Sequence, residues 1–444
     1  MILQNKLGIA MKWAIRTAIA LLLVLAGITA WWVTGPASRV HQVDPAGIPP
    51  DAWPRLSATE VTDLPLSCSF VARDNESLEN RRRPHRNHVY LAKHDGRYFI
   101  MFSYWFGAEG QPGQAVRYAT SEDGISWSEP APLADPAPEH GVIARGFVQR
   151  DGRLFAWYAT HTGDTFFRND KPRIDRNIAI LESEWMGAAQ GWQFRRVVLE
   201  GYLNNYAPQE FGDTQIMAVR DSDRETYLAI SEDGGLSWQV GDKMPRPAKP
   251  AMGDKGLYLP DEPVTLSYAG GAAHVLLRNN NTFDGRLWAA EYEQGSWSDP
   301  YPLDFASDAS KFVPVDLSDG RRAIIGNFNP DVRRALLHIA VSEDGRDYDR
   351  LYRLAPEGQY ANLRWRSPQY PHAIVDGDNL LLAVSYGKRA ISVCKGAASV
   401  AGMDRAAEFK FAPRIAAGIC SKNHPTVLRR LFGYAGCVEH FVWG

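Results

Sequence analysis

The chain has few cysteines and no basic stretch typical of nucleic-acid binding, and both shortages exclude classes of protein. Only 4 of its 444 residues are cysteine. No two of them form a CxxC pair with metal-ligand spacing, so we expect neither a metal nor another cofactor. Lysine and arginine together number 49 against 51 for aspartate and glutamate, a formal net charge of -2. Nucleic acid is therefore not an expected partner, and any recognition of anions must be local.

The cysteines also bear on the compartment. Three of the four lie near the C-terminus, and in an oxidising compartment a C-terminal disulfide such as Cys420–Cys437 is expected. Isolated buried thiols are the alternative.

The N-terminal segment is the one long apolar run. Lys6, Lys12 and Arg16 precede apolar residues 17–33, which end in a pair of tryptophans. A basic flank, an apolar core and interfacial tryptophan predict a single helix through a bacterial inner membrane, with the remaining chain in the periplasm. A cleaved signal peptide, and hence a secreted protein, is the alternative. We therefore expect a membrane anchor or uncleaved signal over residues 1–34 and a linker over 35–60.

The chain beyond the linker lacks any long segment with helical periodicity. Short runs of β-branched and aromatic residues, bounded by glycine, aspartate or asparagine, follow one another instead. This pattern predicts an all-β body over residues 61–395. The stretch 396–444 lacks the pattern and is expected to be a C-terminal extension.

A turn sequence recurs at regular spacing. Residues 121–127 read SEDGISW, residues 231–238 read SEDGGLSW and residues 342–348 read SEDGRDY. The copies lie about 110 residues apart, and degenerate copies between them halve the period to the size of a four-stranded propeller blade. Aspartate is expected to accept backbone N–H groups across the turn, glycine to take a positive φ, and the aromatic residue to pack between blades.

This turn resembles the Asp-box of the sialidase (neuraminidase) superfamily, whose fold is a six-bladed β-propeller. The resemblance extends to segments that in the family carry a glutamate, two arginines and a tyrosine. These segments are Asp261–Leu266, Val275–Asn280, the run from Asn327 to Arg334, and Gln369–Ile374. The resemblance implies a six-bladed, sialidase-like propeller behind the N-terminal transmembrane helix.

The resemblance also implies roles for individual residues. Three arginines of the family bind the substrate carboxylate, and the matching positions are Arg86, Arg278 and Arg334, where the forked guanidinium suits a carboxylate. A neutral tyrosine replaces the usual carboxylate nucleophile, which the substrate's own carboxylate would repel. Tyr370 matches this nucleophile and Glu262 the glutamate that takes its proton.

Two features depart from the family pattern. The family's general acid is an aspartate in a loop that here spans residues 106–114 and contains none, so Glu109 is the candidate acid, with Asp74 as a weaker one. The carboxylate that braces the first arginine is also missing from residues 382–387. Arg86 would then rest on another acid, or the site would accept a different sugar.

These residues predict a retaining exo-glycosidase that removes a terminal acidic 2-keto-3-deoxy sugar, such as sialic acid, from an exported glycan. A hydrolase acting on Kdo in lipopolysaccharide is the first alternative. A non-catalytic carbohydrate-binding propeller is the second. A polysaccharide lyase is the third, and His88, His274 or His372 near the axis would favour it. The expected partners are a glycan with a terminal carboxylated sugar and, through the N-terminal helix, a membrane.

Overall fold

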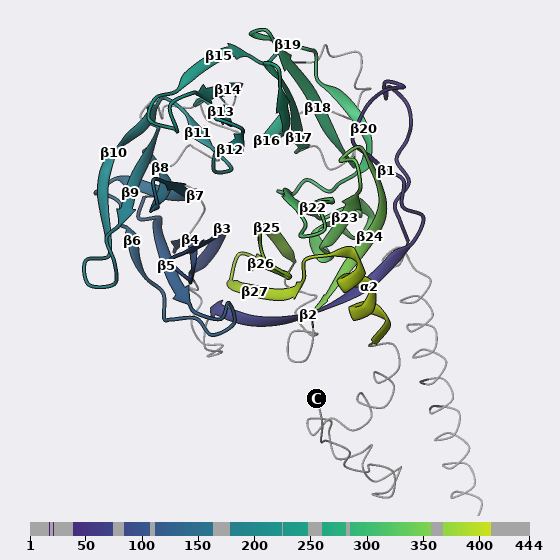
Figure 1. Ribbon diagram of the computed structural model, residues 1–444, viewed down its shortest axis with the longest axis horizontal. Coiled ribbons are helices and arrows are strands. Elements are labelled where there is room, and N and C mark those ends of the chain that lie inside the picture. Colours follow the sequence, from purple (N-terminus) through teal and green to yellow (C-terminus); the bar gives the residue numbers. More distant parts are fainter. Residues whose placement is uncertain are drawn as a thin grey trace, which may run out of the picture.

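The computed structural model describes residues 39–73, 84–106, 112–162, 178–223, 225–246, 260–280, 285–356 and 367–409, with the single positions 17 and 21. Almost all of this part is β-structure arranged as sheets around a ring (Figure 1). Strands β3, β7, β16 and β25 lie on the inner side of the ring. The all-β, propeller-like prediction is therefore confirmed.

Four sheets have four or five strands each. The first contains β3 (His85–His94), β4 (Arg97–Trp105), β5 (Ala115–Ser121) and β6 (Ala131–Ala134). The second contains β7 (His140–Arg150), β8 (Arg153–Thr162), β9 (Ala179–Trp185) and β10 (Trp192–Glu200). The third contains β11 (Leu203–Asn204), β12 (Gln209–Phe211), β13 (Thr214–Arg220), β14 (Thr226–Ser231) and β15 (Gln239–Lys243). The fourth contains β16 (Pro260–Ala269), β17 (Ala272–Asn279), β18 (Arg286–Glu293), β19 (Ser296–Trp297) and β20 (Tyr301–Ala306).

The fifth sheet has nine strands. It runs from β21 (Val313–Asp316) through β22 (Arg322–Gly326), β23 (His338–Ser342), β24 (Asp347–Pro356), β2 (Val61–Ala72), β27 (Ala390–Ala397) and β26 (Asn379–Tyr386) to β25 (Pro368–Asp376), and β1 (Arg55–Leu56) joins β24. A 3-10 helix, η3 (Pro330–Ala335), lies between β22 and β23, and α2 (Val400–Phe409) follows β27.

The prediction of six separate blades is wrong. The described strands form five hydrogen-bonded sheets, because the early strand β2 pairs with β24 in parallel and with β27 in antiparallel. This single strand joins two sets of strands into one sheet of nine. The sequence offers no signal for such a pairing, since β2 carries no turn motif and its partners lie near the other end of the chain.

The predicted membrane anchor finds no support either. Across the described residues, no helix combines the length and apolar character that crossing a bilayer requires. Of residues 1–34, on which the anchor and the periplasmic, single-pass location depended, all but two lie outside the described part. The single-pass assignment is therefore withdrawn.

Burial falls from the inside of each sheet to its outer edge. In β4, every residue from Tyr98 to Phe102 is buried, because both faces of the sheet pack against neighbouring sheets. In the outer strand β10, by contrast, no residue is fully buried. The continuous apolar runs in the sequence are therefore inner strands packed on both faces.

The three repeated turns have the predicted chemistry. Asp123 accepts hydrogen bonds from the backbone N–H groups of Ile125 and Ser126, at 2.8 and 2.6 Å, and Gly124 has φ 77°. Asp233 and Asp344 make the same backbone contacts. The hydroxyl of Ser237 and these N–H groups hold the pKa of Asp233 below its usual range, and the backbone N–H groups do the same for Asp344. The aromatic residue packs on the adjacent sheet, as Trp238 does against the ring of Trp157 at 6.0 Å.

A disulfide secures the strand that closes the ring. Cys68 in β2 and Cys394 in β27 are register partners and are covalently joined. They are 326 residues apart in sequence. The structure thus has a disulfide between the first and last parts of the propeller. The predicted Cys420–Cys437 pair lies outside the described residues.

Removing this disulfide is expected to destabilise the protein. Because the link closes a very long loop of the unfolded chain, the Cys68→Ser/Cys394→Ser variant should lose about 2–5 kcal/mol of unfolding free energy. Urea unfolding with and without reductant would measure the loss. A variant that unfolds at the wild-type midpoint would show that pairing of β2 with β27 closes the ring without it.

Candidate active site

Irregularities at the start of three inner strands shape the candidate site. The pairing of β3, β16 and β25 with the neighbouring strand shifts register near its start. At these shifts His88, Glu262 and Tyr370 take φ values of 53°, 45° and 55°. A non-glycine residue with positive φ costs about 1–3 kcal/mol and is typical of functional sites. Two of the three are the predicted base and nucleophile.

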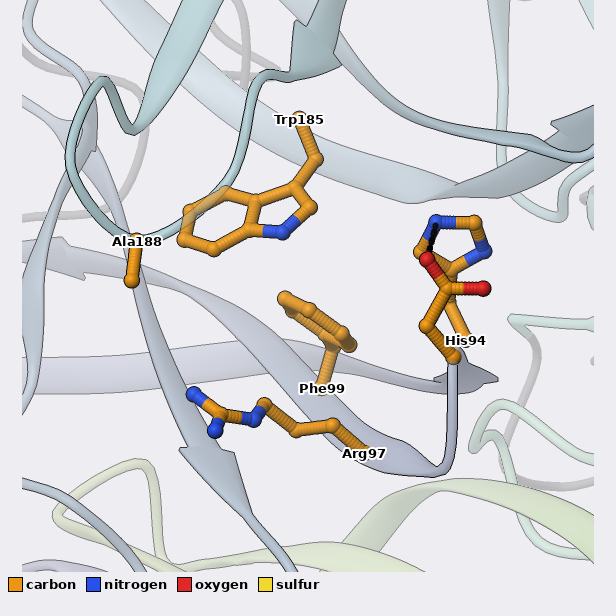
Figure 2. Close-up of a pocket in the computed structure, with 6 residues that line it drawn as sticks. His94, Arg97, Phe99, Trp185 and Ala188 are labelled. Atoms are coloured by element: carbon orange, nitrogen blue, oxygen red, sulfur yellow. Dashed lines mark ion pairs between the residues drawn. The ribbon is translucent and has the colours of Figure 1, made fainter.

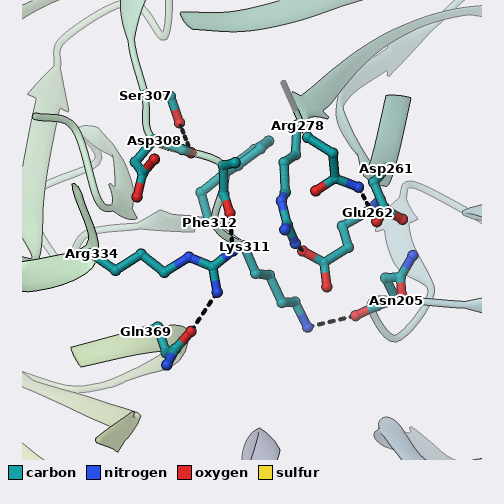
Figure 3. A network of polar contacts seen from close by, with 12 residues as sticks. Asn205, Asp261, Glu262, Arg278, Ser307, Asp308, Lys311, Phe312, Arg334 and Gln369 are labelled. Carbon is teal, nitrogen blue, oxygen red and sulfur yellow. Dashed lines mark hydrogen bonds and ion pairs between the residues drawn. The ribbon is translucent and has the colours of Figure 1, made fainter. Parts of the chain in front are cut away.

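A buried guanidinium connects these two residues. Arg278, near the end of β17, donates from Nη1 to Glu262 Oε2, and it lies close enough to Tyr370 for its charge to act on the phenol. The exposed fractions of Glu262, Arg278 and Tyr370 are 6, 6 and 7%. Figure 3 shows the guanidinium of Arg278 beside the Glu262 carboxylate. The structure thus places these three side chains near one another, and their catalytic roles stay predictions.

Burial and charge have opposite effects on Glu262. Desolvation alone would raise the pKa of this carboxyl, but the nearby charges of Arg278 and Lys311 lower it, with the net result of about 2. Glu262 is therefore ionised throughout the neutral range. An ionised carboxylate is the state that a proton acceptor requires.

Positive side chains surround the ring of Tyr370. The guanidinium carbon of Arg334 lies 5.9 Å from the ring centre and the ammonium of Lys388 lies 5.8 Å away. The imidazole of His88 packs edge-on at 5.3 Å. A negatively charged ligand above this ring would meet cations from separate elements of the chain.

The other two predicted arginines are held by neutral oxygens. Arg334 donates to Gln369 Oε1 at 2.6 Å and to the carbonyl of Ala309 (Figure 3). Arg86 donates to the carbonyl of Arg389 at 2.6 Å and lies over the ring of Tyr104. A backbone carbonyl is thus one support of Arg86 where the family pattern has a carboxylate. Arg278 and Arg334 thus both lie near Tyr370. Arg86 is linked to them only indirectly, because its backbone N–H donates to the carbonyl of Lys388, whose ammonium lies over the Tyr370 ring.

The structure does not describe the two candidate general acids. Glu109 and Asp74 both lie outside the described residues. The identity of a general acid therefore stays a prediction.

Sequence reasoning missed a second group of cations on the axis. Arg145 in β7 and Arg220 in β13 both donate to Asn205 Oδ1, at 3.2 and 3.4 Å. Arg220 also pairs with Asp261, the neighbour of Glu262. Arg145 could have been predicted as a site residue from the sequence, because it interrupts an apolar strand just before a glycine.

Lys311 belongs to the same group. It precedes β21, is 2% exposed and donates from Nζ to the Asn205 carbonyl at 2.6 Å and to Tyr90 Oη at 3.0 Å. Nothing in its sequence neighbourhood indicated this position.

A separate pocket of about 250 Å³ lies elsewhere (Figure 2). Phe99, Trp185 and Ala188 line it together with His94, Asp95 and Arg97 at the turn that follows β3. Arg86 stands near the start of this strand and His94 at its end, about 26 Å apart at 3.3 Å per residue. The pocket is therefore at the face opposite the candidate site and has no part in it.

Two of the three histidines considered for a lyase have partners other than Tyr370. His274 stacks on Trp53 at 3.8 Å and pairs with Glu291. His372 accepts a hydrogen bond from the Leu91 amide, and burial, with the charge of Lys311, lowers its pKa to about 3. His88 remains beside Tyr370.

Comparison with known proteins shows which solved structures have a similar fold. No protein-family model matches the sequence, and no curated protein does. A sialidase from a Hadza microbial source matches in structure with a TM-score of 0.54 at 14% identity, over 70% of this chain and 66% of that one. The chain has a sialidase-like fold.

Two further solved structures agree with this assignment. A Trypanosoma rangeli sialidase, in complex with 2,3-difluorosialic acid as a covalent intermediate, has a TM-score of 0.51 at 12% identity, over 79% of this chain and 59% of that one. A Dyadobacter fermentans protein of unknown function matches with a TM-score of 0.53 at 15% identity, over 74% of this chain and 97% of that one. This chain thus spans about two thirds or less of the two sialidases but nearly all of the Dyadobacter protein. At such identities the likeness concerns the fold alone.

Proposed function

We propose that the protein is a sialidase-like, retaining exo-glycosidase that removes a terminal acidic 2-keto-3-deoxy sugar from a glycan. The observation that carries this proposal is the buried pair of Arg278 with Glu262 beside Tyr370, over whose ring Arg334 lies. A glutamate, a tyrosine and an arginine on the axis of a sialidase-like propeller suit a substrate with a carboxylate on its anomeric carbon.

In the proposed reaction, Tyr370 Oη attacks the anomeric carbon while Glu262 takes the phenolic proton. The bond to the leaving-group oxygen breaks, and an acid, for which Glu109 is the candidate, protonates that oxygen. Water then attacks the anomeric carbon and gives its proton to the conjugate base of the acid, the bond to Tyr370 Oη breaks, and Glu262 returns the proton to that oxygen, so two inversions give overall retention. Arg86, Arg278 and Arg334 would bind the substrate carboxylate, since forked guanidinium groups suit its two oxygens.

Fluorogenic α-glycosides of sialic acid and of Kdo test this function. The full chain should release the fluorophore from one of them, and the preferred glycoside identifies the sugar. Binding of both sugars without release of fluorophore would favour a carbohydrate-binding propeller instead.

A polysaccharide lyase remains the second candidate because the ring centres of His88 and Tyr370 lie 5.3 Å apart. A tyrosine and a histidine side by side can act as acid and base in β-elimination from a uronate. Such a lyase would release an unsaturated product that absorbs in the ultraviolet, whereas a hydrolase would not. Incubating the protein with uronate polysaccharides and recording absorbance separates the two.

A further inference from the structure

The turn between β26 and β27 carries a lysine in an unusual backbone conformation. The chain runs from Tyr386 through Gly387 and Lys388 to Arg389, whose amide donates to the Tyr386 carbonyl at 2.9 Å. Gly387 and Lys388 have φ values of 54° and 57°. Two successive residues with positive φ are typical of the type I′ hairpin turn, in which asparagine and glycine are the usual residues.

Lysine is a poor choice for this backbone. The left-handed region is disfavoured for its side chain, whereas glycine takes it freely and asparagine tolerates it. A glycine or asparagine at position 388 would therefore form the same turn with less strain. Residues held in strained conformations cluster at functional sites, so the strain at Lys388 directs attention to what its side chain contacts.

The Lys388 side chain extends to the proposed nucleophile. Its ammonium lies 5.8 Å from the ring centre of Tyr370, and the guanidinium of Arg334 lies 5.9 Å from the same ring. Tyr370 is buried, whereas Lys388 is partly exposed. A ligand bound over Tyr370 would thus lie within reach of this ammonium.

The same turn also holds Arg86. The backbone N–H of Arg86 donates to the Lys388 carbonyl at 2.9 Å, and its Nη1 donates to the Arg389 carbonyl at 2.6 Å. Ser385, just before the turn, donates from Oγ to the Arg86 carbonyl at 2.8 Å. These bonds fix Arg86 and Lys388 relative to each other. The turn carbonyls are neutral and orient the guanidinium without cancelling its charge, so both cations can act on one anionic group.

We propose that Lys388 is a further substrate-binding residue, whose ammonium binds the acidic group of the ligand together with Arg86. The identity of this ligand as an acidic sugar rests on the proposed function. The turn thereby takes over the support of Arg86 that the family pattern gives to a carboxylate, and it adds a fourth cation to the three predicted arginines.

A cycle between the lysine and the charge of the ligand tests this contact. Titration calorimetry at pH 7 measures the dissociation constants of free sialic acid, free Kdo and their methyl esters, in which a neutral group replaces the carboxylate. Lys388→Asn should weaken binding of the preferred acid about tenfold, because a charge-assisted hydrogen bond is lost, and should change binding of its ester less than about twofold. Equal effects on acid and ester, or no effect on either, would overturn the proposal.

Three measurements separate a binding role from a structural one. Because asparagine tolerates the left-handed backbone, Lys388→Asn should melt at or above the wild-type temperature. Lys388→Arg keeps the charge and should bind the acid more tightly than Lys388→Asn. Lys93→Asn also removes a lysine, but from the surface, where Lys93 pairs with Asp376 at 2.6 Å, and it should leave the dissociation constants unchanged. Acid binding weakened as much by Lys388→Arg or Lys93→Asn as by Lys388→Asn would contradict the proposal.

Failure of this inference is distinguishable from failure of the proposed function. If Lys388→Asn binds the acid as tightly as wild type does, Lys388 is not a binding residue, whatever the protein cleaves. If wild type binds the acid but cleaves neither fluorogenic glycoside, the hydrolase proposal fails, while the cycle still decides the role of Lys388. Binding of neither acid by wild type would contradict both.

Discussion

The Tyr370→Phe variant is expected to lose at least about 1,000-fold in kcat on the glycoside that wild type cleaves, because the attacking oxygen is removed. Its fold should persist. Only the hydroxyl disappears, and the loss of a single hydrogen bond costs no more than about 1 kcal/mol. Initial rates, together with thermal unfolding of the same preparation, measure both effects.

Tyr352→Phe is the matched control for this prediction. Tyr352 is also buried and also loses a hydrogen bond, to Asp404 at 2.6 Å, but it lies in β24 away from the axis. Its kcat should stay within about twofold of wild type. Near-normal turnover by Tyr370→Phe would exclude Tyr370 as nucleophile, whatever the control does.

The Arg278→Met variant is expected to be about 3–5 kcal/mol less stable than wild type. Arg278 and Glu262 are both almost fully buried, so removing the guanidinium leaves a carboxylate without its principal partner in a low-dielectric interior. Denaturant unfolding at neutral pH measures this loss. Adding Glu262→Gln to Arg278→Met should restore part of the stability, because the uncompensated charge is then gone.

The pH dependence of this pair gives a second check on Arg278→Met. Glu262 has a folded pKa of about 2, below the ordinary value of 4.5. Its pairing therefore stabilises the folded state above about pH 4.5, and this contribution is lost as pH falls toward 2. Arg278→Met should lack most of this acid-dependent loss. The exposed pair of Arg350 with Asp404 is the control, and Arg350→Met should change stability by no more than about 1 kcal/mol.

The features that could be predicted from the sequence are local ones. In the turn at Asp123, the groups that donate to the carboxylate lie within three residues of it, so a seven-residue motif is enough to predict these bonds. Glu262 and Tyr370 were predicted as site residues in another way, through resemblance to a family in which the order of the matching residues along the chain is known. Their left-handed backbone had no sequence signal.

The features that could not be predicted depend on distant contacts. Lys311 donates to residues 106 and 221 positions away, and no local pattern specifies either partner. The same is true of β2, whose pairing with β24 and β27 depends on how the whole ring closes. The disulfide of Cys68 with Cys394 follows from that closure and was unforeseen for the same reason.

The measurement that tests the central claim most directly is covalent trapping of the nucleophile. The full chain is incubated with 2,3-difluorosialic acid and with the corresponding fluorinated Kdo, and the protein is analysed by intact-mass and peptide mass spectrometry. We expect one sugar equivalent to be added with loss of fluoride, on the peptide that contains Tyr370, and no addition to Tyr370→Phe. A label on any other residue, or efficient turnover of an acidic glycoside with no label at Tyr370, would contradict the account.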